Sequence, residues 1–172
     1  MITRRTHMAH TVAMTALIGL AAVGLAAPAA SKDDQASVQR LMSNLPKGYT
    51  ADDCQQFPVP DGYPAVAAVS CNANHDPDGP AATGFYLFDN AARLEAQFKH
   101  DIKAFTVQAF PDGTTGPTQW NNGSVALVIA TDDPGTTMLE WTNDTTLILA
   151  LATPQGDANN LYTNWFKGEV AG

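Results

Sequence analysis

The residues with the plainest chemistry are two cysteines, Cys54 and Cys71, the only ones in the chain. A bridge between them closes a loop of about 17 residues and stabilises a fold by about 3 kcal/mol, mainly by restricting the unfolded chain. The alternatives are two free thiols or a metal pair, and two sulfurs alone are a poor set of zinc ligands. In an exported chain such a pair is oxidised, so an export signal would predict a disulfide.

Histidine and serine occur without the spacing that catalysis needs. After residue 29 the chain has two histidines: His75 in a stretch of turn residues and His100 on the polar side of a predicted helix. A hydrolytic triad brings a nucleophile, a base and an orienting acid into contact. No serine lies in a G-x-S-x-G or S-x-x-K motif. We therefore assign no catalytic residue.

Carboxylates form three short clusters that we interpret as turns. Adjacent aspartates at positions 52–53 and 132–133 are candidates for glycosidic acid/base chemistry, but neighbouring side chains in a loop usually point apart. Asp76-x-Asp78-Gly79 resembles part of a calcium loop, yet the closing position that requires Glu is Leu87. The sequence thus indicates no metal ion and no cofactor.

The first 29 residues have the three parts of a secretory signal peptide. Arg4 and Arg5 begin it, residues 11–27 carry no charge, and Ala27-Pro28-Ala29 is a small-x-small cleavage site. The alternative is an uncleaved anchor, but residues 11–27 are shorter than the roughly 20 apolar residues that a membrane span needs. We predict a signal peptide at 1–29, a single secreted domain at 30–172, and no membrane insertion after cleavage.

The acidity of the chain argues against two classes of partner. Removing residues 1–29 takes away two of the 9 Lys+Arg residues and none of the 17 Asp+Glu residues, so the net charge of −8 becomes about −10. A surface of this charge repels phosphate backbones and anionic lipid. We therefore expect no nucleic-acid partner and no membrane-surface partner.

The pattern of apolar residues predicts an α+β fold. Helices are expected at 31–45, 89–105 and 157–168, begun by Ser31, Asp89 and Asp157, with Gly168 ending the last. Strands are expected at 64–72, 82–88, 106–110, 124–130, 137–142 and 145–152. Short turns join consecutive strands and favour antiparallel pairs. We predict an antiparallel sheet of about five to six strands with three helices packed mainly on one face.

Five short motifs follow one another along the chain: Leu45-Pro46-x-Gly48-Tyr49 before Cys54, Ala67-x-Val69-x-Cys71, Asp78-Gly79-Pro80, Trp141-Thr142-Asn143-Asp144 and Leu161-Tyr162-x-x-Trp165. In this set the chain resembles a family of small exported domains of mycobacteria and related actinobacteria. It is also similar to the extracytoplasmic part of some membrane-anchored serine/threonine protein kinases. The resemblance covers nearly all of residues 30–172. It implies an extracytoplasmic location and a sensor-like or binding role, and it carries over no catalytic residue.

The chain departs from the family in its cysteines. Family members have a second pair, at segments that read Gln108-Ala109-Phe110 and Val128-Ile129-Ala130 in this sequence. Both cysteines are absent together, as expected if they bond each other. The resemblance therefore implies that apolar side chains fill this space and that Cys54–Cys71 is the remaining bridge.

The aromatic residues provide the candidate partner surface. Aromatic side chains at helical or strand spacing usually pack in the core. The last predicted helix has two apolar rows, and one row is enough to hold a short helix on a sheet. We expect Leu161 and Trp165 to be buried, and Tyr162 to be partly exposed beside the loop residue Trp120.

We expect a non-catalytic binding or sensor-like module of the cell envelope, with an unidentified envelope component or protein as its partner. The alternatives are a small secreted hydrolase that uses carboxylates and a purely structural envelope protein. A deep cleft with two converging carboxylates favours the hydrolase, and a shallow apolar groove favours binding.

Overall fold

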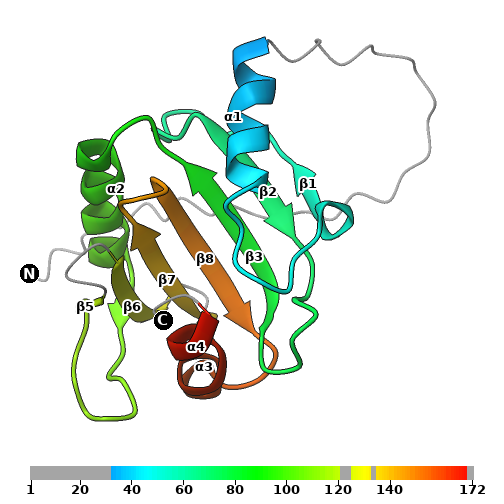
Figure 1. The fold of residues 1–172 in the computed structure, drawn as a ribbon. Helices are drawn as coiled ribbons and strands as arrows, with labels where there is room; N and C mark the ends of the chain where they lie inside the picture. Colours follow the sequence, from blue (N-terminus) through cyan, green and yellow to red (C-terminus); the bar gives the residue numbers. More distant parts are fainter. Residues whose placement is uncertain (1–31, 121–124, 133–134, 170–172) are drawn as a thin grey trace, which may run out of the picture.

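The computed structural model describes residues 32–120, 125–132 and 135–169 (Figure 1). The predicted signal peptide and its cleavage site lie outside these residues. The elements are α1 (Lys32–Met42), a short helical turn (Ala51–Asp53), β1 (Cys54–Gln56), β2 (Ala67–Cys71), β3 (Pro80–Leu87), α2 (Ala91–Ala104), β4 (Thr106–Val107), β5 (Thr118–Trp120), β6 (Val125–Thr131), β7 (Thr137–Asn143), β8 (Ile148–Pro154), α3 (Ala158–Asn160), a π-helical segment (Leu161–Phe166) and α4 (Lys167–Glu169). None of the helices in the described residues is long and apolar enough to cross a membrane.

The strands form one antiparallel sheet in the order β1-β2-β3-β8-β7-β6-β4, and β5 also pairs with β6. The predicted α+β class and antiparallel sheet are confirmed, with eight strands rather than five or six. Two short strands were missed. β1 lies in a stretch rich in Pro and Asp, and β5 lies in a loop rich in Pro, Gly and Thr, so neither has an apolar alternation of its own.

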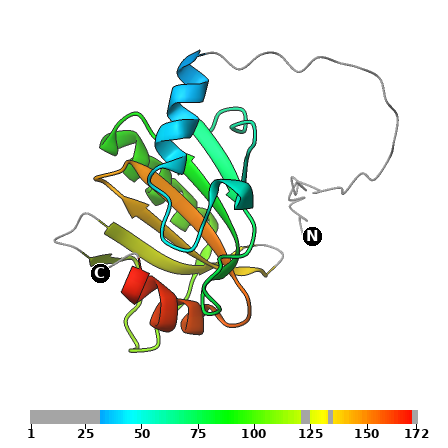
Figure 2. The same ribbon diagram turned by 45° about the vertical axis from the view of Figure 1, so that its right-hand side comes forward.

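The helices divide between the two faces of the sheet. One core, on what we call the first face, joins Leu41 of α1 and Trp165 of the C-terminal helical segment to alternate residues of β2, β3, β6, β7 and β8. The other core, on the second face, joins Leu94 and Phe98 of α2 to Val128 and Leu149. Figure 2 shows α1 and the C-terminal segment on the near side of the sheet and α2 on the far side. Two of the three predicted helices thus share a face, and α2 covers the other.

Several helix ends differ from their predicted residues because local side chains compete for the backbone. α1 ends three residues early, since Ser43 Oγ and Asn44 Nδ2 both donate to the Arg40 carbonyl, at 2.9 and 2.8 Å. The cap of α2 is Asn90 rather than Asp89: its Oδ1 accepts from the Arg93 N–H at 2.9 Å.

The C-terminal segment begins as predicted, with the Asp157 side chain accepting from the Asn159 N–H. It does not end at Gly168, which lies inside α4. The turn between β7 and β8 is also longer than the predicted Asn143-Asp144 pair. Asn143 Oδ1 accepts from two following backbone N–H groups and Leu147 has a φ of 62°, so β8 starts only at Ile148.

Candidate functional site

A groove on the second face lies between α2 and the strands that follow it. One side of α2 faces it with residues at positions i, i+3, i+4 and i+7, the spacing that places four side chains on one helix face. The other walls come from β5 with the residue before it, from β6, and from the end of β7. The groove has a volume of about 450 Å³, and its lining residues are Glu95, Phe98, Lys99, Ile102, Pro117, Thr118, Gln119, Ala126, Thr142 and Asp144.

The groove has buried residues on one side and charged residues along its rim. Phe98 and Thr142 are buried, at 4% and 3% exposure, and the Thr142 hydroxyl accepts from the Ala126 N–H. The exposed rim has two carboxylates, Glu95 and Asp144, and one ammonium, Lys99, which forms an ion pair with Glu95. Partial burial and then the negative charge of Glu95 raise the pKa of Asp144. The rim therefore has an excess of negative charge.

A buried carboxyl group lies on the same face, under α2. Glu140 of β7 is paired in register with Val128 of β6 and Leu151 of β8, and its exposure is 0%. Neither of its carboxyl oxygens has a hydrogen-bond partner among the described residues. Burial, and then the negative charge of Asp101 on α2, raise the pKa of Glu140 to about 9. Glu140 is thus uncharged at neutral pH, a neutral acid inside the core.

Asp101 is itself held by its neighbours on α2. Its Oδ1 accepts from Gln97 Nε2 at 2.7 Å and lies 3.3 Å from His100 Nδ1. Tyr63, which packs against the same core, has a buried hydroxyl without a hydrogen-bond partner among the described residues. Burial and then the charge of Asp101 raise its pKa. Sequence patterns gave no signal for this cluster, because Glu140 is the single acid of its strand and belongs to no motif.

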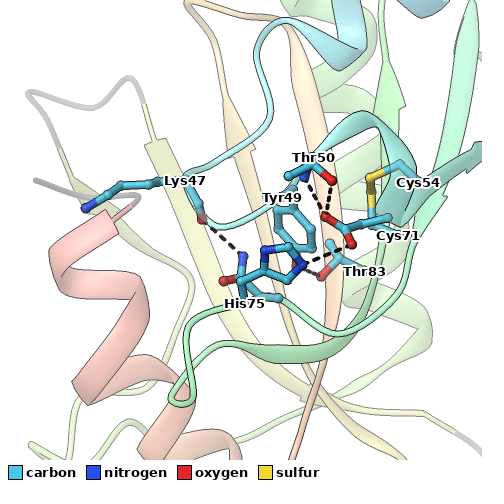
Figure 3. Close-up of a disulfide and its surroundings, with 9 residues drawn as sticks. Lys47, Tyr49, Thr50, Cys54, Cys71, His75 and Thr83 are labelled. Carbon is cyan, nitrogen blue, oxygen red and sulfur yellow. Dashed lines mark hydrogen bonds and ion pairs between the residues drawn. A yellow bond between two sulfur atoms is a disulfide. The ribbon is translucent and has the colours of Figure 1, made fainter.

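The disulfide lies at the opposite edge of the sheet, within a polar corner whose side chains are joined by hydrogen bonds (Figure 3). The predicted bridge between Cys54 and Cys71 is confirmed, and it joins two residues that are direct partners of β1 and β2. Thr50 donates to Asp53 Oδ2 from both its N–H and its hydroxyl, at 2.6 Å each, which lowers the pKa of Asp53. His75 Nε2 lies 3.1 Å from Asp53 Oδ1.

Asn74 joins the two loops of this corner. Its Nδ2 donates to the Lys47 carbonyl at 3.1 Å, and its Oδ1 accepts from the Asp76 N–H at 2.9 Å. Gly48, with a φ of 89°, and Gly79 pack so closely on this side chain that a Cβ at either position would overlap with it. These contacts give Asn74 a structural role in joining the two loops. Among the described residues, no three His, Cys, Asp or Glu side chains are grouped to hold one.

The other predicted candidates for chemistry also serve turns. Asp132 Oδ1 accepts from the N–H groups of Gly135 and Thr136, and Asp133 lies outside the described residues. His75 contacts an acid but no nucleophile. His100 is exposed on α2, and its contact is with Asp101.

The expectation that Tyr162 is partly exposed is wrong, because its exposure is 2%. Its ring packs 4.8 Å from the ring of Phe110, in the loop after β4, and 6.3 Å from that of Phe166. Both apolar rows of the C-terminal segment are thus covered, one by the sheet and one by this loop. Trp120 ends β5 opposite Val125, and its side chain lies outside what the structure describes. Tyr162 therefore offers no open surface.

The two segments at which the resemblance placed a second cysteine pair, residues 108–110 and 128–130, are neighbours in space. The Gln108 N–H donates to the Ile129 carbonyl at 2.8 Å, and Phe110 is buried. Comparison of the chain with known proteins finds no matching family model, no matching curated protein and no matching solved structure.

Proposed function

We propose that this domain is an exported, non-catalytic binding module, and that the α2 groove takes a small ligand with an apolar body and a cationic group. The observation that carries the proposal is the groove itself, whose buried side includes the apolar ring of Phe98 and whose exposed rim holds Glu95 and Asp144. Sites for small molecules commonly combine apolar walls with a few polar groups that fix orientation.

The negative charge of the rim favours a cationic ligand over an anionic one. Lys99 balances one of the two carboxylates, and partial burial and then repulsion by Glu95 raise the pKa of Asp144. A cation next to these carboxylates relieves that repulsion, whereas an anion adds to it. The acidic sequence as a whole favours a cationic ligand in the same way.

The proposed location rests on the sequence together with the bridge. A disulfide in a small domain fits an oxidising compartment, and the N-terminal segment has the pattern of a signal peptide. The resemblance to exported actinobacterial domains supports a sensor-like role in the envelope, with an envelope component or another protein as the natural source of the ligand.

The proposal is tested with octylammonium as the probe and n-octanol as its uncharged counterpart, by titration followed with NMR chemical shifts. We expect octylammonium to shift residues of the groove and to bind at least fivefold more tightly than n-octanol. Asp144→Asn should weaken octylammonium about fivefold, the effect of about 1 kcal/mol for an exposed charge pair. Asp52→Asn, the same change at an exposed site outside the groove, should leave binding unchanged.

Two results would overturn the proposal. Equal binding of octylammonium and n-octanol would remove the role of the rim charge. Shifts that appear only outside α2, β5, β6 and the end of β7 would place the ligand elsewhere.

One observation favours the hydrolase alternative: two carboxylates, Glu95 and Asp144, line the same groove and have unlike surroundings. Both are exposed to water, however, and Glu95 is paired with Lys99. Release of 4-nitrophenol from 4-nitrophenyl glycosides by the wild-type domain, lost in Asp144→Asn, would favour the hydrolase over the binding module.

A further inference from the structure

The carboxyl group of Glu140 is buried in a place where it can be tolerated only without charge. It lies on the second face of β7, with apolar neighbours from both adjacent strands and 0% exposure. Its two oxygens make no hydrogen bond within the described part of the chain. An isolated ionised carboxylate in such surroundings costs far more than a neutral acid, so the group keeps its proton while the face is closed.

The groups that face Glu140 add no counter-charge. α2 contributes Asp101, whose negative charge opposes ionisation, and β6 and β8 contribute Val128 and Leu151. The phenols near the pair, Tyr63 from the loop before β2 and Tyr86 from β3, both have a pKa raised by burial and by Asp101. His100 borders Asp101 on its exposed side.

Helix α2 contributes both to the surroundings of Glu140 and to the groove. Asp101 lies on α2, and so do Glu95, Phe98, Lys99 and Ile102, which form one wall of the groove. Movement of α2 away from the sheet would therefore admit water to Glu140 and remove that wall together. We propose that the buried carboxyl group of Glu140, beneath α2, is a pH-sensitive latch: α2 stays on the sheet, and the groove stays formed, only while Glu140 keeps its proton. This role of the latch in binding rests on the function proposed above.

The direction of the pH effect follows from where the proton is bound. In the closed state Glu140 has a pKa of about 9, and once α2 opens its carboxyl group returns to an ordinary value near 4.5. Between these two values, opening releases one proton. The opening constant should therefore rise tenfold for each unit of pH, and should level off below about pH 4.5 and above about pH 9. Low pH therefore favours the closed position of α2, and high pH favours its opening.

The test is backbone amide hydrogen exchange of α2 in the wild-type domain and in Glu140→Gln, at pH 5, 6, 7 and 8, without any ligand. Comparison at equal pH removes the pH dependence of the intrinsic exchange rate. We expect α2 amides of the wild type to lose protection relative to Glu140→Gln by tenfold per pH unit. We also expect them to exchange faster than the slowest amides of β3 and β8, because α2 opens locally. Asp52→Asn, the same replacement of a carboxyl group by an amide at an exposed site, should keep the wild-type slope.

Two outcomes would overturn the latch. In one, the wild type and Glu140→Gln show the same dependence on pH. In the other, α2 exchanges only at the rate of the slowest sheet amides, which means that it opens only when the whole domain unfolds. If Glu140→Gln does not fold, Asp101→Asn gives the answer instead. Without the neighbouring charge the slope should persist at low pH but level off at a lower pH than in the wild type, and an unchanged upper limit would contradict the pairing.

Because the exchange experiment contains no ligand, its failure is distinct from failure of the proposed function. A flat exchange profile with octylammonium bound in the groove would reject the latch alone. A tenfold slope without any binding would reject the ligand and leave the latch as a property of the fold.

Discussion

The polar corner at the disulfide and the buried cluster under α2 treat polar side chains in opposite ways. In the corner, Asp53, Asn74 and Tyr49 all have partners, and the Tyr49 hydroxyl lies 2.7 Å from Thr83 Oγ1. Under α2, the carboxyl group of Glu140 and the hydroxyl of Tyr63 have none within the described residues. Satisfied polar groups hold a shape, whereas buried groups left unsatisfied cost stability and so point to another role. On the first face, the indole N–H of Trp165 is also buried without a hydrogen-bond partner among the described residues.

The largest expected effect concerns the corner. Replacing both Cys54 and Cys71 by Ala should lower the free energy of unfolding by about 2–5 kcal/mol, the range for native bridges in small secreted domains. Urea denaturation of the oxidised wild type and of the double variant measures it. A loss below about 1 kcal/mol would show that the hydrogen bonds of the corner hold it without the bridge. Titration of the unfolded, unreduced wild type should find no free thiol.

Two substitutions of Tyr162 distinguish the contribution of its buried ring from that of its hydroxyl group. Tyr162→Ala should cost about 3 kcal/mol through the cavity left between Phe110 and Phe166. Tyr162→Phe keeps the ring and should cost less than about 1 kcal/mol. Thermal and urea melts of the two variants check this. A small loss for Tyr162→Ala would restore Tyr162 as an exposed partner residue.

Replacement of Glu140 should raise the free energy of unfolding, in contrast to the two changes above. Its pKa is raised in the folded state, so its contribution to stability is greatest below the unfolded value near 4.5 and is lost as pH rises toward about 9. Glu140→Gln removes this loss and should raise the free energy of unfolding at pH 7 by about 3 kcal/mol, because pH 7 is about 2.5 units above the unfolded pKa, with a larger gain at pH 8. Urea midpoints at pH 5, 7 and 8 measure it. Destabilisation by Glu140→Gln at every pH would place Glu140 among the satisfied groups of the comparison.

The smallest expected effect is at the rim of the corner. His75 is mostly exposed, and its contact with Asp53 is a surface ion pair at most. His75→Ala should change the free energy of unfolding by no more than about 0.5 kcal/mol. A loss above 1 kcal/mol, measured in the same urea series, would mean that the corner depends on His75 as well as on Asn74.

Local patterns in the sequence predicted the elements and failed where distant parts of the chain meet. The spacing of Leu94 and Phe98 was enough to predict α2, and the cysteines were enough to predict the bridge. Strand β1 was missed because its three residues, Cys54–Gln56, are extended by pairing with β2 rather than by their own propensity. The burial of Tyr162 was missed because its cover, Phe110, comes from a loop about fifty residues earlier.

The candidate site was still less predictable. The groove exists because β5 pairs with β6 opposite α2, which no local pattern encodes. Glu140 was overlooked for a related reason: a polar residue in a strand is expected at the solvent face, and only the docking of α2 covers this one. The turns at Asp76 and Asp132, in contrast, were interpreted correctly from their Asp, Gly and Pro content, whereas Asp52 and Asp53 lie in a short helical turn.

The position of the disulfide also bears on how the protein behaves in a crowded solution. The bridge holds β1, the edge strand, directly onto β2. If it is reduced, only non-covalent contacts such as the backbone hydrogen bond from Phe57 to Ala68 hold β1 in place. Release of β1 would leave β2 with unpaired backbone groups along its outer side. Such an edge is a template for strands of another chain. Reducing agents should therefore favour self-association of the protein as well as weaken its fold, so the bond also serves as a guard against aggregation.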